Sequence, residues 1–408
     1  GENPTINITN ETVDKTSISI TVNGSDSYSG ITSYKFSKDN GSNYETINTS
    51  EDTYTYTFNN LESGTEYSIK VQVIDEAGNI GEISKEISTE SDNPGDYILA
   101  KEGGIEAIKA KGTPNFANTA TTDEGMYAAE DDYGTSYYYR GAVNDNWLQF
   151  GTNSSGQPLY WRIVRINGDG SVRLIYNGTS TATTGNSTMI NTDLEFNNSR
   201  NNNMYVGYMY QSGQVHGLQT NSNIKTTIDN WYTSNLSDEA EYLDGNAGFC
   251  GDRTPYSGNG TGTSNTYYAA HNRLTTNKIP SLKCSDSRDL YTIPGSSKGN
   301  GALKVTPGNN DSTPTPIGLI TADEVAFAGG VRGSNNTSYY LYNNAAYWTM
   351  SPFNCPDARV FSVWSDGSLN GDYVDYTRGV RPVINLRADV SLTGSGTSTN
   401  PFKVVGAS

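Results

Sequence analysis

Residues Tyr347–Leu386 read YWTMSPFNCPDARVFSVWSDGSLNGDYVDYTRGVRPVINL. The two ends of this stretch, Tyr347–Pro352 and Gly379–Ile384, are rich in apolar residues and predict scaffold strands. Between them lies a mixture of Asn, Asp, Ser, Tyr, Trp and Phe, with one Cys and no Lys. Such residues give a large contact area and hydrogen bonds at low entropic cost. The stretch therefore predicts a contact surface; the competing interpretation is a plain Tyr-rich strand pair with a turn at Ser365–Gly367.

The composition indicates a folded, β-rich protein. The chain has 408 residues, too many for one ordinary domain. Hydrophobic content is only 34%, but 29 Tyr and 10 Phe supply mass for burial, and disordered chains are poor in aromatics. The net charge of -17 argues against nucleic acid or anionic lipid as a partner, because both select basic surfaces. No apolar run reaches transmembrane length, and no signal peptide opens the sequence.

The three cysteines predict one disulfide. Cys250 and Cys284 both lie in loop-like sequence, and a bond between them would stabilise the long connection that separates them. Two reduced, buried thiols are the alternative. With 2 His and no Cys/His cluster, structural zinc is not expected, and we expect no cofactor. Cys355 is left without a partner inside the predicted contact surface.

Residues 1–92 predict a separate, all-β sandwich. Apolar and polar residues alternate in Thr16–Val22, Tyr54–Phe58 and Tyr67–Ile74, as they do in half-buried strands. Turn signals separate these short strands, as in β-sandwich domains.

Two motifs in this module resemble those of known domains. Leu61–Tyr67 resembles the tyrosine corner of fibronectin type III domains, and Asp75–Asn79 resembles bacterial Ig-like repeats of surface proteins. The resemblance implies that Leu61 fills the core and that the Tyr67 hydroxyl ties down the crossing between the sheets. A spacer role is expected, with Asp75 capping a turn in preference to binding calcium.

Residues 93–408 predict a second domain of the α+β class with long irregular loops, such as Tyr256–Thr266 and Gly295–Thr315. The polar segment Thr89–Gly95 marks the boundary before it. Asp96 is expected to cap a following helix, which Gly103-Gly104 weakens.

The second domain also contains clear strand and helix signals. Strands are expected at Tyr137–Val143 and Leu159–Ile166, and the turn Asn167–Gly170 predicts a hairpin to a further strand. Ile224–Leu236 has helical spacing of apolar residues. Thr321–Gly330 predicts a short helix with a capping box formed by its first residue and Glu324.

This second domain resembles the C-type-lectin-like fold in its bacterial and phage form, shared by formylglycine-generating enzymes and by the variable proteins of diversity-generating retroelements. The resemblance rests on five motifs in order: Tyr160–Val164 with its hairpin, Thr321–Gly330, Tyr347–Pro352, Ser365–Ser368 and Gly379–Ile384. Together they span most of Tyr137–Leu392 and are more specific for a fold than for one function.

In retroelement variable proteins, the C-terminal part of this fold displays diversified side chains that bind a ligand. The matching segment is 347–382, and its contact residues would be Phe353, Asn354, Cys355, Asp357, Ser362, Trp364, Asn370, Asp372, Tyr373, Asp375 and Tyr376. Diversification at adenines turns Asn-type codons into codons for Asp, Ser, Tyr, Phe or Cys. An unpaired surface Cys355 fits such a process, whereas Trp364 fits the codon set poorly.

Other branches of the family are not supported by their motifs. Formylglycine-generating enzymes need a redox-active cysteine pair near the C-terminal end, and Cys355 has no such neighbour. Calcium-dependent lectins use Glu-Pro-Asn or Gln-Pro-Asp together with Trp-Asn-Asp, and neither pattern occurs.

The candidate catalytic groups favour non-catalytic roles. His216 and His271, the two histidines, are expected to be solvated or capping residues. Gly295–Gly299 matches Gly-x-Ser-x-Gly, but the sequence after it does not predict the helix of a nucleophile elbow. The acidic cluster at Asp123–Tyr133 is expected to cap turns or face water. We therefore expect that the chain is not an enzyme.

The register of Ala358–Ser365 decides whether the contact surface exists. Alternation places Arg359 and Phe361 on one face and Ser362 and Trp364 on the other. If the first pair is inward, Trp364 projects outward as an anchor; in the reverse register it belongs to the core.

With the outward register, we expect a protein of the cell surface or extracellular space that binds a protein or glycan ligand on another cell surface. One alternative is a structural array or adhesin domain without diversification, in which the same segment packs against a neighbouring copy. The other is a carbohydrate-active enzyme, for which an acid pair in a cleft would be the sign.

Overall fold

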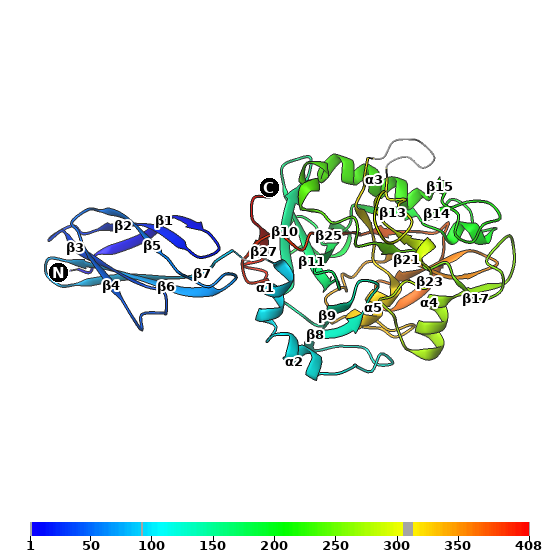
Figure 1. The fold of residues 1–408 in the computed structure, drawn as a ribbon, viewed down its shortest axis with the longest axis horizontal. Helices are drawn as coiled ribbons and strands as arrows, with labels where there is room; N and C mark the ends of the chain where they lie inside the picture. Colours follow the sequence, from blue (N-terminus) through cyan, green and yellow to red (C-terminus); the bar gives the residue numbers. More distant parts are fainter. Residues whose placement is uncertain (1, 91–92, 305–312, 408) are drawn as a thin grey trace. The chain divides into compact units, whose positions relative to one another are not determined.

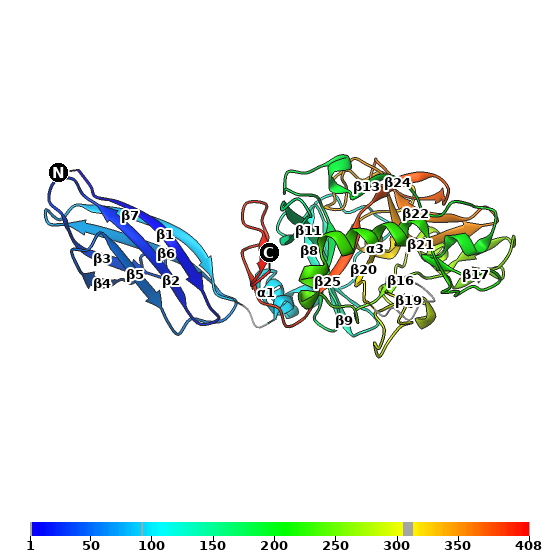
Figure 2. The ribbon, with the colours of Figure 1, turned by 90° about the horizontal axis from the view of Figure 1, so that it is seen from above.

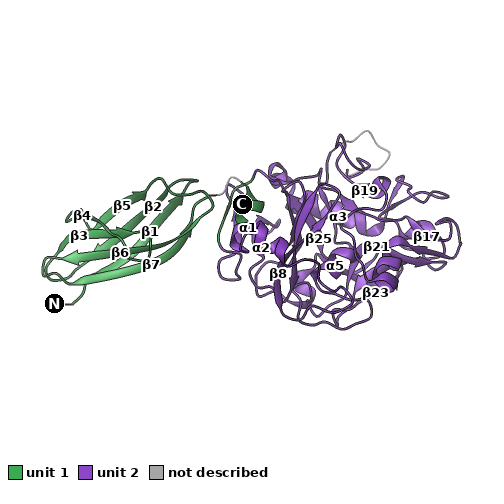
Figure 3. Cartoon of the chain, turned by 60° about the horizontal axis from the view of Figure 1, so that its bottom comes forward, with its two compact units in different colours: residues 1–97, 390–394 green, residues 98–389, 395–408 purple. Residues whose placement is uncertain are grey.

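The computed structural model describes residues 2–90, 93–304 and 313–407. Residues 91–92 of the predicted boundary segment and residues 305–312 of the predicted long loop lie outside the described residues. The chain forms two compact units (Figure 3): residues 1–97 with 390–394, and residues 98–389 with 395–408. The boundary predicted from the sequence, between residues 92 and 93, lies five residues before the boundary between residues 97 and 98 in the structure.

The first unit is a sandwich of two antiparallel sheets (Figures 1 and 2). Its strands are β1 (Thr5–Val13), β2 (Ile18–Ser25), β3 (Ile31–Ser37), β4 (Glu45–Asn48), β5 (Thr53–Phe58), β6 (Glu66–Asp75) and β7 (Ile80–Ser88). One sheet has the order β1-β2-β5 and the other the order β4-β3-β6-β7. Every second residue of β2 and β6 is buried between the sheets, as the alternation predicted.

The tyrosine corner is present. Leu61 is buried in the core of the sandwich, and the Tyr67 hydroxyl accepts a hydrogen bond from the backbone N–H of Glu62 at 2.9 Å. At the last hairpin, the two carboxylate oxygens of Asp75 accept hydrogen bonds from the side chain and the backbone N–H of Asn79, at 2.7 and 2.8 Å. These bonds hold the pKa of Asp75 below its ordinary value, so Asp75 caps a turn, as expected.

The helix predicted after residue 96 is two short helices, α1 (Pro94–Lys101) and α2 (Ile105–Ala110). Gly103 and Gly104 interrupt it, with φ of 87° and 84°, in the left-handed region. The predicted cap is wrong: the side-chain oxygen of Asn93 accepts from the backbone N–H groups of Gly95 and Asp96. Asp96 lies inside the first turn.

The second unit contains two larger sheets and several short strand pairs. Its further elements begin with β8 (Asp123–Glu130), β9 (Thr135–Gly141), β10 (Trp147–Thr152), β11 (Pro158–Ile166), β12 (Val172–Tyr176), β13 (Asn191–Glu195), β14 (Met209–Tyr210), β15 (Thr220–Asn221) and α3 (Asn223–Asn235). They continue with β16 (Phe249–Cys250), β17 (Pro255–Ser257), β18 (Thr266–Tyr268), α4 (Ala269–His271), β19 (Leu290–Tyr291), β20 (Ile317–Leu319) and α5 (Ala322–Ala328). The chain ends with β21 (Tyr347–Cys355), β22 (Arg359–Val363), β23 (Leu369–Tyr373), β24 (Thr377–Val380), β25 (Pro382–Leu386), β26 (Leu392–Thr393) and β27 (Phe402–Val404).

One of the two sheets has the order β20-β25-β12-β11-β10-β27, with β9 beside β11 and β8 beside β9. The predicted hairpin is present, because β11 and β12 pair antiparallel across the turn at residues 167–170. The other sheet has the order β13-β24-β21-β18-β17, and β22 and β23 extend it from β21 (Figures 1 and 2). This second sheet carries the predicted contact segment. The unit is mostly β, with few helices.

Helix α5 joins the two sheets. Its capping box is formed by Thr321 and Glu324, as predicted, and every residue of the helix is buried. The Glu324 carboxylate also lies 3.0 Å from Arg165 of β11 and 2.6 Å from Arg173 of β12. The N–H of Ala322 donates to the Ser351 hydroxyl of β21 at 2.9 Å. None of the helices in the described part of the chain is long and apolar enough to cross a membrane.

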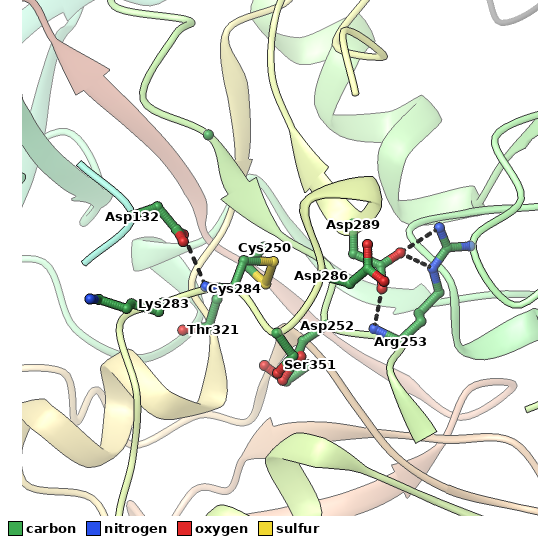
Figure 4. Close-up of a disulfide and its surroundings, with 12 residues drawn as sticks. Asp132, Cys250, Asp252, Arg253, Lys283, Cys284, Asp286, Asp289, Thr321 and Ser351 are labelled. Carbon is green, nitrogen blue, oxygen red and sulfur yellow. Dashed lines mark hydrogen bonds and ion pairs between the residues drawn. A yellow bond between two sulfur atoms is a disulfide. The ribbon is translucent and has the colours of Figure 1, made fainter. Parts of the chain in front are cut away.

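The predicted disulfide is present (Figure 4). Cys250, at the end of β16, is bonded to Cys284 across 34 residues of sequence. The backbone N–H of Cys284 donates to the Asp132 carboxylate at 2.9 Å. The connection between β18 and β19, which contains α4, the helical segment Asn272–Asn277 and the short helical turn Ser287–Asp289, is thus tied to the short β16–β19 pair.

The tyrosine corner gives a first prediction. Tyr67→Phe removes the acceptor for the Glu62 N–H and should destabilise the first unit by about 1 kcal/mol. Hydrogen exchange of the β6 amides should then speed up about fivefold in the intact chain. Tyr28→Phe, at a tyrosine that is 78% exposed, is the control and should leave exchange unchanged. Equal exchange in the two variants would show that the corner contributes nothing.

The disulfide gives a second prediction. Replacing both Cys250 and Cys284 by Ser should lower the unfolding free energy of the second unit by about 3–4 kcal/mol, because a 34-residue loop becomes free in the unfolded chain. Urea unfolding followed by tryptophan emission reports on this unit, because it contains all 5 Trp. Reduced wild-type protein should match the variant. A midpoint that neither change moves would contradict the prediction.

Candidate binding surface

The predicted contact residues lie along one continuous part of the second sheet. Phe353, Asn354 and Cys355 end β21, and Asp357 lies in the turn to β22. The remaining positions follow in order: Ser362 in β22, Trp364 just after it, Asn370, Asp372 and Tyr373 in β23, and Asp375 and Tyr376 before β24. Because β22 pairs with both β21 and β23, the strands that carry these residues are adjacent in space.

The register of β22 matches neither simple alternative. Val360, Phe361, Ser362 and Val363 are all buried, so both faces of the strand are covered. Trp364 is nevertheless 40% exposed, because the chain leaves the strand there and enters a tight turn. Its backbone N–H and C=O bond to Ser368 and Gly367, each at 2.9 Å. The anchor predicted from alternation is therefore exposed for a different reason: its position at the strand end.

Four of the predicted contact residues are buried, and the expectation that they face water is corrected. They are Phe353, Cys355, Ser362 and Asp372. The Phe353 ring packs edge-on against Phe361, at 4.9 Å between ring centroids. The thiol of Cys355 is free, as predicted, but it lies inside the sheet beside Tyr268, and burial raises its pKa to about 12. The other seven residues are at least partly exposed.

The buried Asp372 carboxylate holds the exposed side chains in place. One of its oxygens accepts hydrogen bonds from the Ser362 hydroxyl at 2.6 Å and from the Trp364 indole N–H at 3.1 Å. The same oxygen accepts from the Arg378 guanidinium at 2.8 Å. Hydrogen bonds to an ionised group are stronger than neutral ones. The indole of Trp364 is therefore oriented before any ligand arrives.

A second group of rings and cations lies around Tyr373. Its ring is 5.1 Å from that of Tyr376, which is 45% exposed, in an edge-to-face arrangement. The guanidinium groups of Arg359 and Arg200 lie 4.1 and 4.3 Å from the centre of the Tyr373 ring. Arg200 also pairs with Asp375 at 3.5 Å. The exposed aromatics thus lie among arginines.

Sequence reasoning missed these arginines. The contact between Arg359 and Tyr373 could have been predicted from the sequence. The turn at Asp366 and Gly367 fixes the register of β22 and β23, and in that register Arg359 lies opposite Tyr373. Arg200 comes from a loop more than a hundred residues earlier, and no local signal in the sequence links it to this surface. His271, expected to be a solvated or capping residue, is half-buried, with its ring 4.6 Å from that of Phe353.

The charged pocket beside the disulfide is structural (Figure 4). Asp252 and Asp323, an acid pair of the kind that a glycosidase would need, both bind the Arg273 guanidinium, at 2.5 and 2.8 Å. The cavity that they line measures about 20 Å³, room for about one water molecule and not for a sugar ring. The predicted acidic cluster near it also caps a turn: Asp131 accepts from the N–H groups of Tyr133 and Gly134.

His216 has a structural environment as well. Its ring nitrogens lie 2.9 Å from Asp289 and 3.7 Å from Asp286. Asp289 is fully buried and also pairs with Arg253 at 2.8 Å. His216 therefore lies against a cluster of acidic residues and Arg253 in the loop region; the sequence predicted a solvated or capping histidine, and the ring is largely buried.

Comparison with solved structures gives weak, partial likenesses. One is to the chitinase ChiA74 from Bacillus thuringiensis, with 16% identity over 38% of this chain and 20% of that chain and a TM-score of 0.15. Another is to a cycloalternan-degrading enzyme from Trueperella pyogenes, with 7% identity over 41% and 26% of the two chains and a TM-score of 0.16. The chain thus spans about a quarter or less of the length of these proteins.

These matches correct one sequence-based prediction. The prediction that the chain is not an enzyme is contradicted, because the matched proteins are enzymes by name, and we withdraw it. At TM-scores this low, the likeness carries no argument for a particular activity.

Among curated proteins, no sequence matches this chain. A family model, the fibronectin type III domain, matches residues 2–90. The match covers the whole two-sheet sandwich with its tyrosine corner. Residues 2–90 form a fibronectin type III domain.

Proposed function

We propose that this protein binds a ligand noncovalently through the surface around Trp364, Tyr373 and Tyr376, and that the fibronectin type III domain serves as a spacer. The ligand is a protein or glycan on another cell surface, and the protein acts outside the cell or on its surface. A disulfide fits such an oxidising location.

The observation that carries this proposal is that Trp364 and Tyr376 are exposed and are also held in a fixed orientation by neighbouring side chains. Trp364 and Tyr376 are large, exposed rings that lie 12 positions apart in the sequence and in neighbouring parts of one sheet. Trp364 is bonded to Asp372, and Tyr376 rests against Tyr373. Rings that are already ordered lose little entropy on binding, so more of their contact energy remains as affinity. Trp, Tyr and Arg are the residues that dominate binding energy at protein interfaces.

The proposal includes the C-type-lectin-like fold for the second unit and its relation to retroelement variable proteins. Supporting it are the hairpin of β11 and β12, the capped helix α5 and the strands β21 to β25, which follow one another as the resemblance implies. Diversification would act on the partly exposed positions: Asn354, Asp357, Trp364, Asn370, Tyr373, Asp375 and Tyr376. Flanking DNA with a near-repeat of these codons, altered at adenines beside a reverse transcriptase gene, is the test of this part.

Removal of the two exposed rings tests the binding surface. The double variant Trp364→Ala, Tyr376→Ala should weaken binding of the labelled protein to ligand-bearing cells at least about thirtyfold, because the loss of even one such anchor costs about 2 kcal/mol. Binding is measured on a panel of bacterial and animal cells and on cell-wall material. The control, Tyr28→Ala, removes an exposed tyrosine from the first unit and should bind as wild type does.

Equal binding by the double variant, with an unchanged melting temperature, would contradict the proposed surface. Absence of binding by wild type to every cell and wall preparation would contradict the function itself. If the double variant instead loses self-association, the surface joins neighbouring copies, as in a structural array.

The role of Asp372 gives a separate prediction. Asp372→Asn keeps the side-chain shape but removes the charge that holds Trp364 and Arg378, so cell binding should weaken about fivefold through loss of orientation. Loss of the charged hydrogen bonds should also cost about 1–3 kcal/mol of unfolding free energy. Asp238→Asn changes an exposed carboxylate elsewhere in the same unit and is the matched control. Binding that is unaffected by Asp372→Asn would show that orientation does not contribute.

A further inference from the structure

A group of three basic side chains lies at the edge of the binding surface. Arg332 follows α5, and its backbone forms a bridge to Leu369 at the start of β23. Lys278 ends the helical segment that continues α4, in a left-handed conformation with φ 54°. His271 ends α4 itself. We call these three residues the basic cluster.

Contacts tie the basic cluster to the predicted contact residues. The guanidinium of Arg332 lies 5.3 Å from the centre of the Phe353 ring, and the His271 ring packs edge-on against the same ring at 4.6 Å. Arg332 also donates a hydrogen bond to the side-chain oxygen of Asn370 at 2.7 Å. The cluster therefore adjoins the surface that carries Trp364 and Tyr376.

The guanidinium of Arg332 is unusually poor in acceptors. Its Nε is buried and has no hydrogen-bond partner among the described residues, and Asn370 is the acceptor for one other nitrogen. Two fully buried arginines without a carboxylate, Arg162 and Arg381, show the difference: each donates to at least two oxygens of the protein. Arg332 thus has hydrogen-bond donors that the described residues leave without an acceptor.

The basic cluster has no negative charge to balance it. Among the described residues, neither Arg332 nor Lys278 forms an ion pair, and the Lys278 ammonium donates to the backbone oxygen of Leu274 at 3.1 Å. Burial, and after it the charge of Arg332, lowers the pKa of both Lys278 and His271. Arg332 and Lys278 therefore repel each other, and the His271 ring is held in its neutral form near pH 7.

Unbalanced positive charge stands out in this protein. The chain has 44 acidic residues against 27 Lys and Arg. Eight other arginines of the second unit each lie within 3.0 Å of a carboxylate oxygen: Arg140, Arg165, Arg173, Arg253, Arg273, Arg288, Arg378 and Arg387. With acids this abundant, two half-buried cations, Arg332 and Lys278, without a carboxylate indicate a site whose counter-charge comes with a ligand.

We infer that the basic cluster binds an Asp or Glu side chain of a protein ligand, with the carboxylate seated between Arg332 and Lys278. The inference rests on the proposed function and specifies the chemistry that its ligand presents. Both side chains line a cavity of about 10 Å³, whose other walls are mostly apolar and which has room for one oxygen atom of such a group. Ile279, 66% exposed beside Lys278, offers an apolar contact to the rest of the ligand. The Trp, Tyr and Arg content of the adjoining surface favours a protein over a glycan.

The test uses a labelled oligoglutamate peptide as the probe, with the intact chain at low salt. The double variant Arg332→Gln, Lys278→Gln should bind it at least about tenfold more weakly than wild type, because hydrogen bonds to charged groups contribute about 1.5–3 kcal/mol. The control variant Lys109→Gln, Lys403→Gln also removes two positive charges and so has the same net charge as the test variant. Both of its lysines are exposed and lie elsewhere in this unit. It should change binding less than about twofold.

Histidine titration by NMR locates the bound probe. The chain has 2 His, so both ring signals can be followed. Oligoglutamate should raise the pKa of His271 by about 1 unit, because it brings a carboxylate near the ring. His216, which already faces Asp289 and Asp286, should not respond. Melting temperatures of all variants establish that each one is folded.

Three results would overturn the inference: equal loss of binding in the two charge-matched variants, an unmoved His271, or tighter binding of oligogalacturonate than of oligoglutamate, which would assign the cluster to an acidic glycan. Failure here is separable from failure of the proposed function. If Trp364→Ala, Tyr376→Ala abolishes cell binding while Arg332→Gln, Lys278→Gln retains it, the surface binds a ligand but the carboxylate inference is wrong.

Discussion

Glu324 is the residue on which the second unit most depends. Its carboxylate accepts from the N–H of Thr321 and so caps α5, and it also pairs with Arg165 and Arg173 on two strands of the first sheet. Burial raises the pKa of Glu324, but Arg173 and Arg165 outweigh burial and hold it below its ordinary value. A buried carboxylate with this many partners is costly to disrupt, because loss of one partner leaves a charge uncompensated.

The helix that Glu324 caps also supports the strands of the candidate binding surface. Helix α5 packs on β9, β21 and β23, and its N-terminus is bonded to Ser351 of β21. Asp372 of β23 is a second buried carboxylate that accepts several hydrogen bonds, and one of them orients the exposed ring of Trp364. In the basic cluster the charges are unpaired: Arg332 and Lys278 have no carboxylate partner among the described residues. That difference separates charges that stabilise the fold from charges available to a ligand.

Local signals in the sequence predicted most of the elements. The tyrosine corner, the hairpin at residues 167–170, the capping box of α5 and the disulfide are all present, because each depends on a few residues close in sequence or on cysteine count. The helix after Asn93 was also found, but Asn93 caps it and not Asp96. Side-chain type alone does not separate two candidate capping residues that lie three positions apart.

The parts that failed depend on contacts between distant segments. Alternation could not show that β22 is covered on both faces, so Ser362 was expected in water. Phe353 and Cys355 at the end of β21 were also expected in water, because their burial depends on contacts with Phe361 and Tyr268 on other strands. Nor could it show that Arg200 and Arg332 would reach the surface from other parts of the chain. The exclusion of enzyme activity rested on missing motifs, which is a weak basis, and comparison with other structures contradicted it.

The most direct measurement of the central claim is hydroxyl-radical footprinting of the intact protein on ligand-bearing cells. The account predicts that oxidation of Trp364 and Tyr376 falls on binding, whereas the exposed Tyr28 and Tyr256 remain as reactive as in the free protein. Unchanged oxidation of Trp364 and Tyr376 in the bound state, or protection centred on other residues, would contradict it.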